Sequence, residues 1–129
     1  MKKIFTNGCF DILHVGHVEL LNHAKSLGDY LIVGLNSDSS VKKLKGDSRP
    51  INKQEDRKKI LESLKSVDEV IIFDEETPLN LIKAVNPDII VKGGDYKKEE
   101  VVGNTLAEIV IFNFVEGFST TKTIQRIKS

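Results

Sequence analysis

The N-terminal segment runs Lys3-Ile4-Phe5-Thr6-Asn7-Gly8-Cys9-Phe10-Asp11-Ile12-Leu13-His14-Val15-Gly16-His17, and it indicates the fold. Its first four residues form a short apolar run typical of a strand buried in a parallel sheet. Gly8 then allows a turn in which the backbone can approach a ligand closely. The glycine spacing is neither that of dinucleotide-binding oxidoreductases nor that of a Walker A loop. The segment predicts a strand, a ligand-binding turn and a helix.

The same alternation of short apolar runs and amphipathic stretches continues along the chain. The runs are rich in Ile, Val and Phe without polar alternation, which indicates strands buried on both faces. The pattern predicts an α/β fold over residues 1–129: one domain with a doubly wound, Rossmann-like, five-stranded parallel sheet and helices on both faces. Such sheets bind ligands beyond the carboxyl ends of their strands. The expected strands are Lys3–Thr6, Tyr30–Leu35, Glu69–Phe73, Ile89–Lys92 and Ile109–Phe114.

Four helices are expected between and after these strands. The first ends at Gly28 in the C-cap role, and the third begins at Thr77-Pro78, where Thr can cap and Pro fits the first turn. Asn86-Pro87 closes the third helix, and the last opens at Ser119 or Thr120. Residues 42–45 are expected in a basic loop after the second strand. The expected apolar stripes are Val18, Leu21, Ala24 and Leu27 in the first helix, Ile60, Leu61, Leu64 and Val67 in the second, and Leu79, Ile82 and Ala84 in the third.

Charge and composition exclude several classes of protein. Lys plus Arg and Asp plus Glu both number 19, so the formal net charge is zero and bulk binding to nucleic acid is not expected. The single cysteine, Cys9, rules out an internal disulfide and fits a reducing compartment. No apolar run is long enough to span a bilayer. We therefore expect a cytoplasmic protein that binds neither nucleic acid nor membranes.

His14 and His17 stand three residues apart at the expected N-terminus of a helix, a spacing that places both rings on one side. The helix end also offers free N–H groups and a positive dipole, which favour a phosphate. The pair could instead bind zinc, with His23 one turn further on, or simply pack and cap the helix. We favour phosphate recognition, because imidazoles can donate hydrogen bonds to oxygens that gain charge in a transition state.

Two motifs at opposite ends of the chain carry a family resemblance. Thr6–Asp11 followed by His14-Val15-Gly16-His17 resembles the opening of the cytidylyltransferase-like nucleotidyltransferases. Gly117-Phe118-Ser119-Thr120-Thr121-Lys122 resembles the second signature of that superfamily, a Ser/Thr-rich turn that opens the final helix. The resemblance covers essentially the whole chain. It implies direct in-line transfer of a nucleotidyl group from a nucleoside triphosphate to a phosphorylated acceptor.

The middle of the chain narrows the resemblance. Val41–Gly46, Ser48–Ile51 and Val91–Tyr96 are similar to the adenylyltransferase domain of heptose-phosphate enzymes. This implies that ATP and D-glycero-D-manno-heptose 1-phosphate give ADP-heptose and pyrophosphate, for lipopolysaccharide or other surface glycans, with a separate sugar kinase upstream. Glycerol-3-phosphate cytidylyltransferase shares the opening, but its closing motif carries an Arg-Thr pair where this chain has Phe114-Val115. Other sugar-phosphate nucleotidyltransferases using CTP or GTP and a non-catalytic nucleotide-binding regulatory module remain alternatives.

Several residues are expected at the site. His14 and His17 would donate to the triphosphate near the transferred phosphorus. The resemblance raises Lys45 as a phosphate clamp and Arg57 as a cation directed toward the phosphates. Asp11 is expected to fix its loop by hydrogen bonds beside the substrate, while Asp38 and Asp95 are candidates for sugar or ribose hydroxyls, Asp38 also for the metal. The remaining expected contacts are Thr6, Asn7, Gly8, Cys9, Phe10, Gly16, Lys92, Gly94, Ser119, Thr120 and Thr121.

Two further expectations concern partners. Mg²⁺ should arrive with the triphosphate, bound largely by phosphates and water, because Mg²⁺ keeps much of its hydration. No dedicated carboxylate cage is expected. Cys9 should be an inert, semi-buried thiol, since nothing near it in the sequence would lower its pKa. The family resemblance makes a homodimer plausible.

Overall fold

The structure is a computed structural model that describes residues 1–113 and Ile127. Its five strands form one sheet in the order β3-β2-β1-β4-β5, with every neighbouring pair parallel. This confirms the predicted doubly wound, Rossmann-like sheet, since the chain moves outward from β1 in both directions. The strands are β1 Lys3–Gly8, β2 Tyr30–Asn36, β3 Glu69–Phe73, β4 Ile89–Gly93 and β5 Glu108–Phe112.

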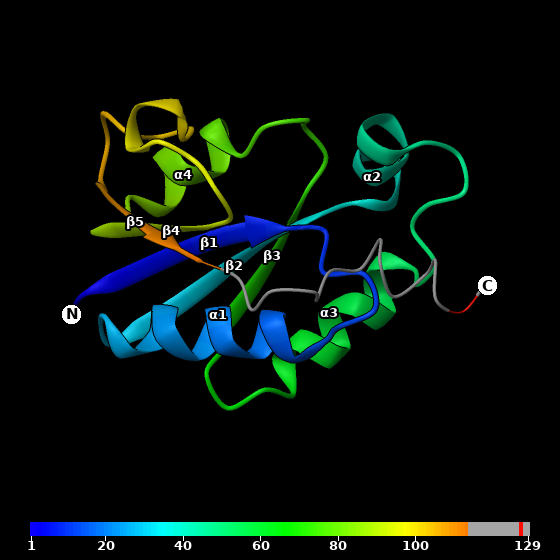
Figure 1. Cartoon of the computed structure of the whole chain (residues 1–129), viewed down its shortest axis with the longest axis horizontal. Helices are drawn as coiled ribbons and strands as arrows, with labels where there is room; N and C mark the ends of the chain where they lie inside the picture. Colours follow the sequence, from blue (N-terminus) through cyan, green and yellow to red (C-terminus); the bar gives the residue numbers. More distant parts are fainter. Residues whose placement is uncertain (114–126, 128–129) are drawn as a thin grey trace.

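Helices cover both faces of the sheet, as predicted. Figure 1 shows α1 and α3 on one face and α4 with the short 3-10 helix η1 on the other. Each face has its own core: Leu21 and Leu61 pack on one side, Ile82 and Val85 on the other. Burying these side chains supplies the main favourable term in folding. The helices are α1 Val15–Ser26, α2 Asp38–Lys45, α3 Gln54–Glu62, α4 Leu79–Val85 and η1 Lys98–Glu100.

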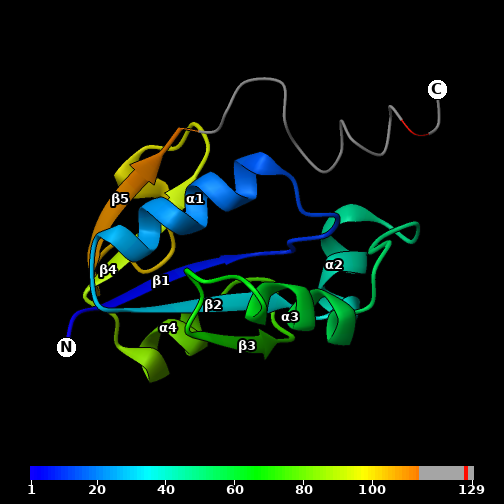
Figure 2. The ribbon, with the colours of Figure 1, turned by 90° about the horizontal axis from the view of Figure 1, so that it is seen from below.

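The segment after β2 was expected as a basic loop, and this was wrong. Residues 38–45 form α2, whose N-terminus is capped by Ser37, with its side chain accepting a hydrogen bond from the Ser40 N–H. The prediction failed because α2 is polar and lacks a long apolar stripe; Val41 is its one buried apolar residue. The helix ends at Lys45 beside the carboxyl end of the sheet (Figure 2).

The predicted helix ends were partly right. Asn86 closes α4 with left-handed backbone, as expected from Asn86-Pro87. Thr77 makes no capping hydrogen bond, and the buried face of α4 includes Val85 while Ala84 is exposed. Gly28 follows the actual C-cap of α1, Leu27. A Cβ on Gly28 would lie 2.7 Å from Ile4 Cδ1, so glycine is required there for close packing against β1.

The topology leaves the carboxyl ends of β1 and β4 open for a ligand. The connections that leave these two neighbouring strands pack on opposite faces, which creates a crevice between them. At the amino ends of the strands, three aspartates fix the backbone: Asp29, Asp68 and Asp88 accept the backbone N–H groups of Lys2, Leu31 and Lys3, respectively. No helix among the described residues is long and apolar enough to cross a membrane.

Candidate active site

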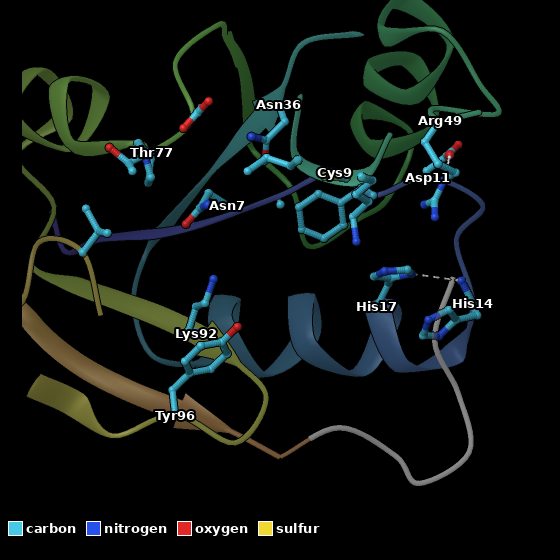
Figure 3. A pocket seen from close by; sticks show the side chains of 17 residues that line it. Asn7, Cys9, Asp11, His14, His17, Asn36, Arg49, Thr77, Lys92 and Tyr96 are labelled. Atoms are coloured by element: carbon cyan, nitrogen blue, oxygen red, sulfur yellow. Dashed lines mark hydrogen bonds and ion pairs between the residues drawn. The ribbon is translucent and has the colours of Figure 1, made fainter. Parts of the chain in front are cut away.

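A cleft of about 540 Å³ lies at the carboxyl end of the sheet (Figure 3). Its floor is the turn after β1, and its walls come from the start of α1, the end of α2 and the segment after β4. The cleft therefore lies where the switch-point rule predicts a ligand. The expected residues that line the cleft are Asn7, Gly8, Cys9, Phe10, Asp11, His14, His17, Lys45 and Lys92.

The two histidines form a reciprocal cap at the start of α1. His14 Nδ1 accepts the N–H of Gly16 at 3.0 Å, and His17 Nδ1 accepts the N–H of His14 at 3.2 Å. The ring centroids lie 4.0 Å apart, which confirms that both imidazoles share one side of the helix. Since each Nδ1 is an acceptor, the proton of each neutral ring belongs on Nε2. The cap therefore fixes the tautomer and leaves Nε2–H as the donor.

Burial keeps both rings uncharged near neutral pH. It lowers the pKa of His17 to about 4, and His14 beside it contributes to that shift. Burial also lowers the pKa of His14. Phe10 lies against His17, with ring centroids 5.5 Å apart, and helps to hold the imidazole in place. The pair is thus built to donate hydrogen bonds as neutral imidazoles.

The structure does not support His23 as a third zinc ligand beside His14 and His17. The His23 ring packs against Phe112, with centroids 5.1 Å apart. Among residues 1–113 and Ile127 no cluster of three or more His, Cys, Asp or Glu side chains could hold a metal ion. Both Nδ1 atoms of the pair are also engaged by backbone N–H groups.

Asp11 fixes the active loop, as expected. Its carboxylate accepts the backbone N–H groups of Ile51 and Asn52 at 2.6 and 2.9 Å and the Nε–H of Arg49 at 3.2 Å. The carboxylate is 1% exposed. Phe10 and Ile12 on either side have φ of 46° and 53°, a backbone region that costs non-glycine residues free energy. The hydrogen bonds to Asp11 stabilise this strained turn.

Arg57 does not line the cleft, although the family resemblance directed it toward the phosphates of the ligand. It is 1% exposed and donates to the carbonyl oxygens of Cys9, Asn36 and Asn52. Its Nη2 also bonds Asp38 at 2.9 Å. Arg57 therefore ties together the turn after β1, the end of β2 and the start of α3. The resemblance identified an important arginine, but its contacts are with three backbone carbonyls and the Asp38 carboxylate.

Asp38 is likewise occupied within the protein and does not line the cleft. Its Oδ1 accepts the Gln54 N–H at 2.9 Å, while the Gln54 side chain accepts the Asp38 N–H at the same distance. Together with the ion pair to Arg57, these bonds join α2 to α3. The expected sugar or metal contact of Asp38 has no support in this arrangement.

Lys45 and Lys92 both line the cleft, and their expected phosphate contacts stay predictions. Burial lowers the pKa of Lys92, and its Nζ lies 5.0 Å from the centroid of the Tyr96 ring. Burial raises the pKa of the Cys9 thiol. The nearby cations, Lys45 most strongly, lower that pKa, but burial has the larger effect. Cys9 thus agrees with the expected inert, partly buried thiol.

The remaining expected contacts lie behind or beside the cleft. Thr6 is 1% exposed within β1, and Gly16 is buried, with its N–H bound to His14. Gly94 has φ of 115° and donates to the Phe112 carbonyl, and Asp95 is exposed outside the cleft lining. Their direct ligand contacts were not supported. Ser119, Thr120 and Thr121 lie outside the described residues, so their roles stay predictions.

Sequence reasoning missed part of the cleft lining. Arg49 lay in a segment used only for the family resemblance, and Thr77 was assigned to helix capping. A stricter use of the switch-point rule, extended from strand ends to the loops that face them, would have included Tyr96 after β4. The lining residues that were not expected are Asn36, Leu44, Arg49, Glu76, Thr77, Pro78, Tyr96 and Val102.

Comparison with known proteins agrees with this geometry. The cytidylyltransferase-like family model matches residues 5–127. The bifunctional protein HldE of Aliarcobacter butzleri is 63% identical over 98% of this chain, and that of Helicobacter pylori strain Shi470 is 57% identical over 98%. The chain spans 27% and 28% of the length of these two relatives.

Solved structures show the same fold. A lipopolysaccharide core biosynthesis protein from Thermoplasma volcanium superposes with a TM-score of 0.74 at 30% identity, covering 89% of this chain and 97% of that one. Pantothenate synthetase from Thermus thermophilus superposes with a TM-score of 0.60 at 19% identity, covering 89% of this chain and 56% of that one, which shows likeness of fold alone.

Proposed function

Because the chain belongs to the cytidylyltransferase-like family, we propose that it is a nucleotidyltransferase that joins ATP to D-glycero-D-manno-heptose 1-phosphate. The products are ADP-heptose and pyrophosphate. The HldE relatives and the lipopolysaccharide core biosynthesis protein support a role in surface-glycan synthesis. One observation carries the nucleotidyltransferase proposal: two neutral imidazoles, each with Nδ1 held by a backbone N–H, stand at the wall of the switch-point cleft.

The proposed reaction is a single displacement at phosphorus. An oxygen of the heptose 1-phosphate attacks the α-phosphorus of ATP, and the bond from that phosphorus to the bridging α–β oxygen breaks. The bridging oxygen leaves with pyrophosphate and takes the bonding electron pair. Such a step needs positioned reactants and stabilised negative charge, and it requires no nucleophilic side chain. The buried Cys9 thiol therefore has no covalent role.

His14 and His17 would act as hydrogen-bond donors in this step. Their Nε2–H groups stabilise the phosphate oxygens that gain charge as pyrophosphate departs. Because the cap already orients both rings, little reorganisation accompanies the reaction. The low pKa of His17 keeps its Nδ1 an acceptor of the His14 N–H over a wide pH range, so the cap that orients the ring persists. Loss of one such donor lowers kcat by about 10²- to 10³-fold in comparable sites.

The cations of the cleft would bind the phosphates of the two reactants. Lys45 and Lys92 both line the cleft, and each can pair with a negatively charged phosphate oxygen. We propose that Asn7, Gly8, Cys9 and Phe10 form the floor under the nucleotide. The sequence assigns the β- and γ-phosphates to the hydroxyl and backbone donors of Ser119, Thr120 and Thr121.

We propose that Mg²⁺ enters the cleft bound to the triphosphate. The Asp11 carboxylate, which lines the cleft, already accepts hydrogen bonds from Arg49 and two backbone N–H groups, which favours a metal held mainly by phosphate oxygens and water. When bound, the ion neutralises phosphate charge and eases the departure of pyrophosphate. A sugar kinase must act upstream to make the acceptor. A homodimer stays a prediction, and ATP as donor favours the cytoplasm.

Pyrophosphate release from a matrix of donors and acceptors tests the proposal. ATP, CTP and GTP would each be combined with heptose 1-phosphate, other sugar 1-phosphates and glycerol 3-phosphate. We expect the highest kcat/KM for ATP with heptose 1-phosphate. Highest turnover of CTP with glycerol 3-phosphate would establish the alternative acceptor, and nucleotide binding without turnover of any pair would establish a regulatory module. His23→Ala, which alters a histidine of α1 outside the cleft, is the control for His17→Ala.

A further inference from the structure

Within the part of the chain that the structure describes, the two arginines near the cleft make very different contacts. Arg57, which the family resemblance favoured for phosphate, has Nε and both Nη atoms bonded to three carbonyls and Asp38. The side chain of Arg49 makes one hydrogen bond to the described residues, from Nε to Asp11. Arg49 also lines the cleft, whereas Arg57 does not. The arginine free to recognise a ligand is therefore Arg49.

The burial of Arg49 is unusual for an arginine without a full set of partners. The residue is 8% exposed, and an arginine is almost never buried unless it is paired. Among the described residues, no fully buried side-chain nitrogen lacks a hydrogen-bond partner. Nη1 and Nη2 of Arg49, which have no partner there, must therefore keep their small accessible surface. Arg49 lines the cleft, so a ligand bound there would lie beside this side chain.

Asp11 holds this guanidinium in a defined position. The backbone N–H groups of Ile51 and Asn52 donate to this carboxylate and fix its position. The hydrogen-bond partner of Arg49 Nε is therefore held in place. Figure 3 shows Arg49 and Asp11 together above His14 and His17, at the same end of the cleft. A guanidinium bound through Nε presents its two Nη groups as a planar fork, which matches two oxygens of a phosphate.

The surrounding charge also suits an anion. Lys45 lines the same cleft, and both Lys45 and Arg49 lower the pKa of the Cys9 thiol on the floor, although burial outweighs them. The Asp11 carboxylate is paired with Arg49 and also accepts two backbone N–H groups. A phosphate bound between Arg49 and the histidines would therefore meet donors on two sides.

We propose that Arg49 binds a phosphate group of one of the two reactants through Nη1 and Nη2. This inference rests on the proposed function and adds a binding residue to it. The phosphate belongs either to ATP or to the sugar phosphate, and the two sources share the same chemistry. Arg49→Gln removes the charge and the fork, whereas Arg49→Lys keeps the charge without the fork.

Binding of each reactant alone tests the proposal without relying on turnover. Isothermal titration would use ATP with Mg²⁺, heptose 1-phosphate, and unphosphorylated heptose as the probe that lacks the phosphate. We expect Arg49→Gln to weaken the binding of one phosphorylated probe by about 10- to 100-fold, with a smaller loss for Arg49→Lys. The probe that loses affinity identifies the source of the phosphate. Heptose affinity should not change.

Lys43→Gln is the matched control, since it removes one positive charge from an exposed position of α2 that does not line the cleft. It should leave both affinities unchanged. If both Arg49 variants fold and bind both phosphorylated probes like the wild type, the role of Arg49 is only structural, through its hydrogen bond to Asp11. That result would overturn the proposal. If Arg49→Gln does not fold, Arg49→Lys decides by the same criterion. If the wild type binds neither phosphorylated probe, the proposed function itself has failed.

Discussion

Replacing His14 by serine should separate the two roles of its imidazole. As the N-cap of α1, His14 accepts the Gly16 N–H through Nδ1, and as a proposed catalytic donor it uses Nε2–H. Serine is among the best N-cap residues and accepts the same kind of backbone N–H, but it cannot place a donor where Nε2 lies. His14→Ala removes both functions. The pair of variants therefore measures the cap and the donor independently.

The expected magnitudes follow from these contacts. Losing the cap costs about 1 kcal/mol of unfolding free energy, or about 3–5 °C in Tm for a chain of this size. Losing the donor should lower kcat by about 10²- to 10³-fold. His14→Ser should therefore have the Tm of the wild type and a kcat about 10²- to 10³-fold lower. His14→Ala should be equally slow and less stable.

Thermal unfolding monitored by circular dichroism and steady-state pyrophosphate release, with ATP and heptose 1-phosphate both saturating, give the two readouts. Wild-type kcat in His14→Ser would refute the donor role. Equal Tm values for His14→Ser and His14→Ala would refute the contribution of the cap. His23→Ala, on the same helix but outside the cleft, should retain wild-type kcat.

Three further predictions concern stability. Because folding lowers the pKa of His17 from 6.5 to about 4, stability should be full above pH 6.5 and fall by about 1–2 kcal/mol toward pH 4, the ring being only partly buried. Urea unfolding measures this, and His17→Gln, which keeps a capping acceptor, should lack that slope. Arg57→Met should lose about 3–5 kcal/mol in the same assay, since three carbonyls and Asp38 lose their donor; a loss under 1 kcal/mol would contradict this. Gly28→Ala should lose about 1–3 kcal/mol, because its Cβ would lie 2.7 Å from Ile4 Cδ1 and 2.9 Å from the Lys2 carbonyl oxygen, and wild-type stability would refute that clash.

The sheet was predictable because its signals are local. Runs such as Tyr30–Leu35 and Glu69–Phe73 are apolar without alternation, and they became β2 and β3 with nearly the same ends. Helix α2 was missed because its sequence is polar and its stability depends on Ser37, Val41 and the bonds from Asp38 to Gln54. These stabilising contacts are a cap, one buried residue and hydrogen bonds to a later segment. They produce no hydrophobic periodicity from which a helix could be predicted.

By itself, the sequence determined the order of the strands, the family, and the position of His14 and His17 at a helix start. These depend on hydrophobic periodicity and on short motifs, whose spacing is fixed by backbone geometry. Only the tertiary structure decided which of the two arginines Arg49 and Arg57 lines the cleft. Arg57 meets Cys9 across 48 residues, and Arg49 meets Asp11 across 38. Which arginine is saturated depends on those long-range partners, because a buried guanidinium satisfies whichever carbonyls and carboxylates the fold brings to it.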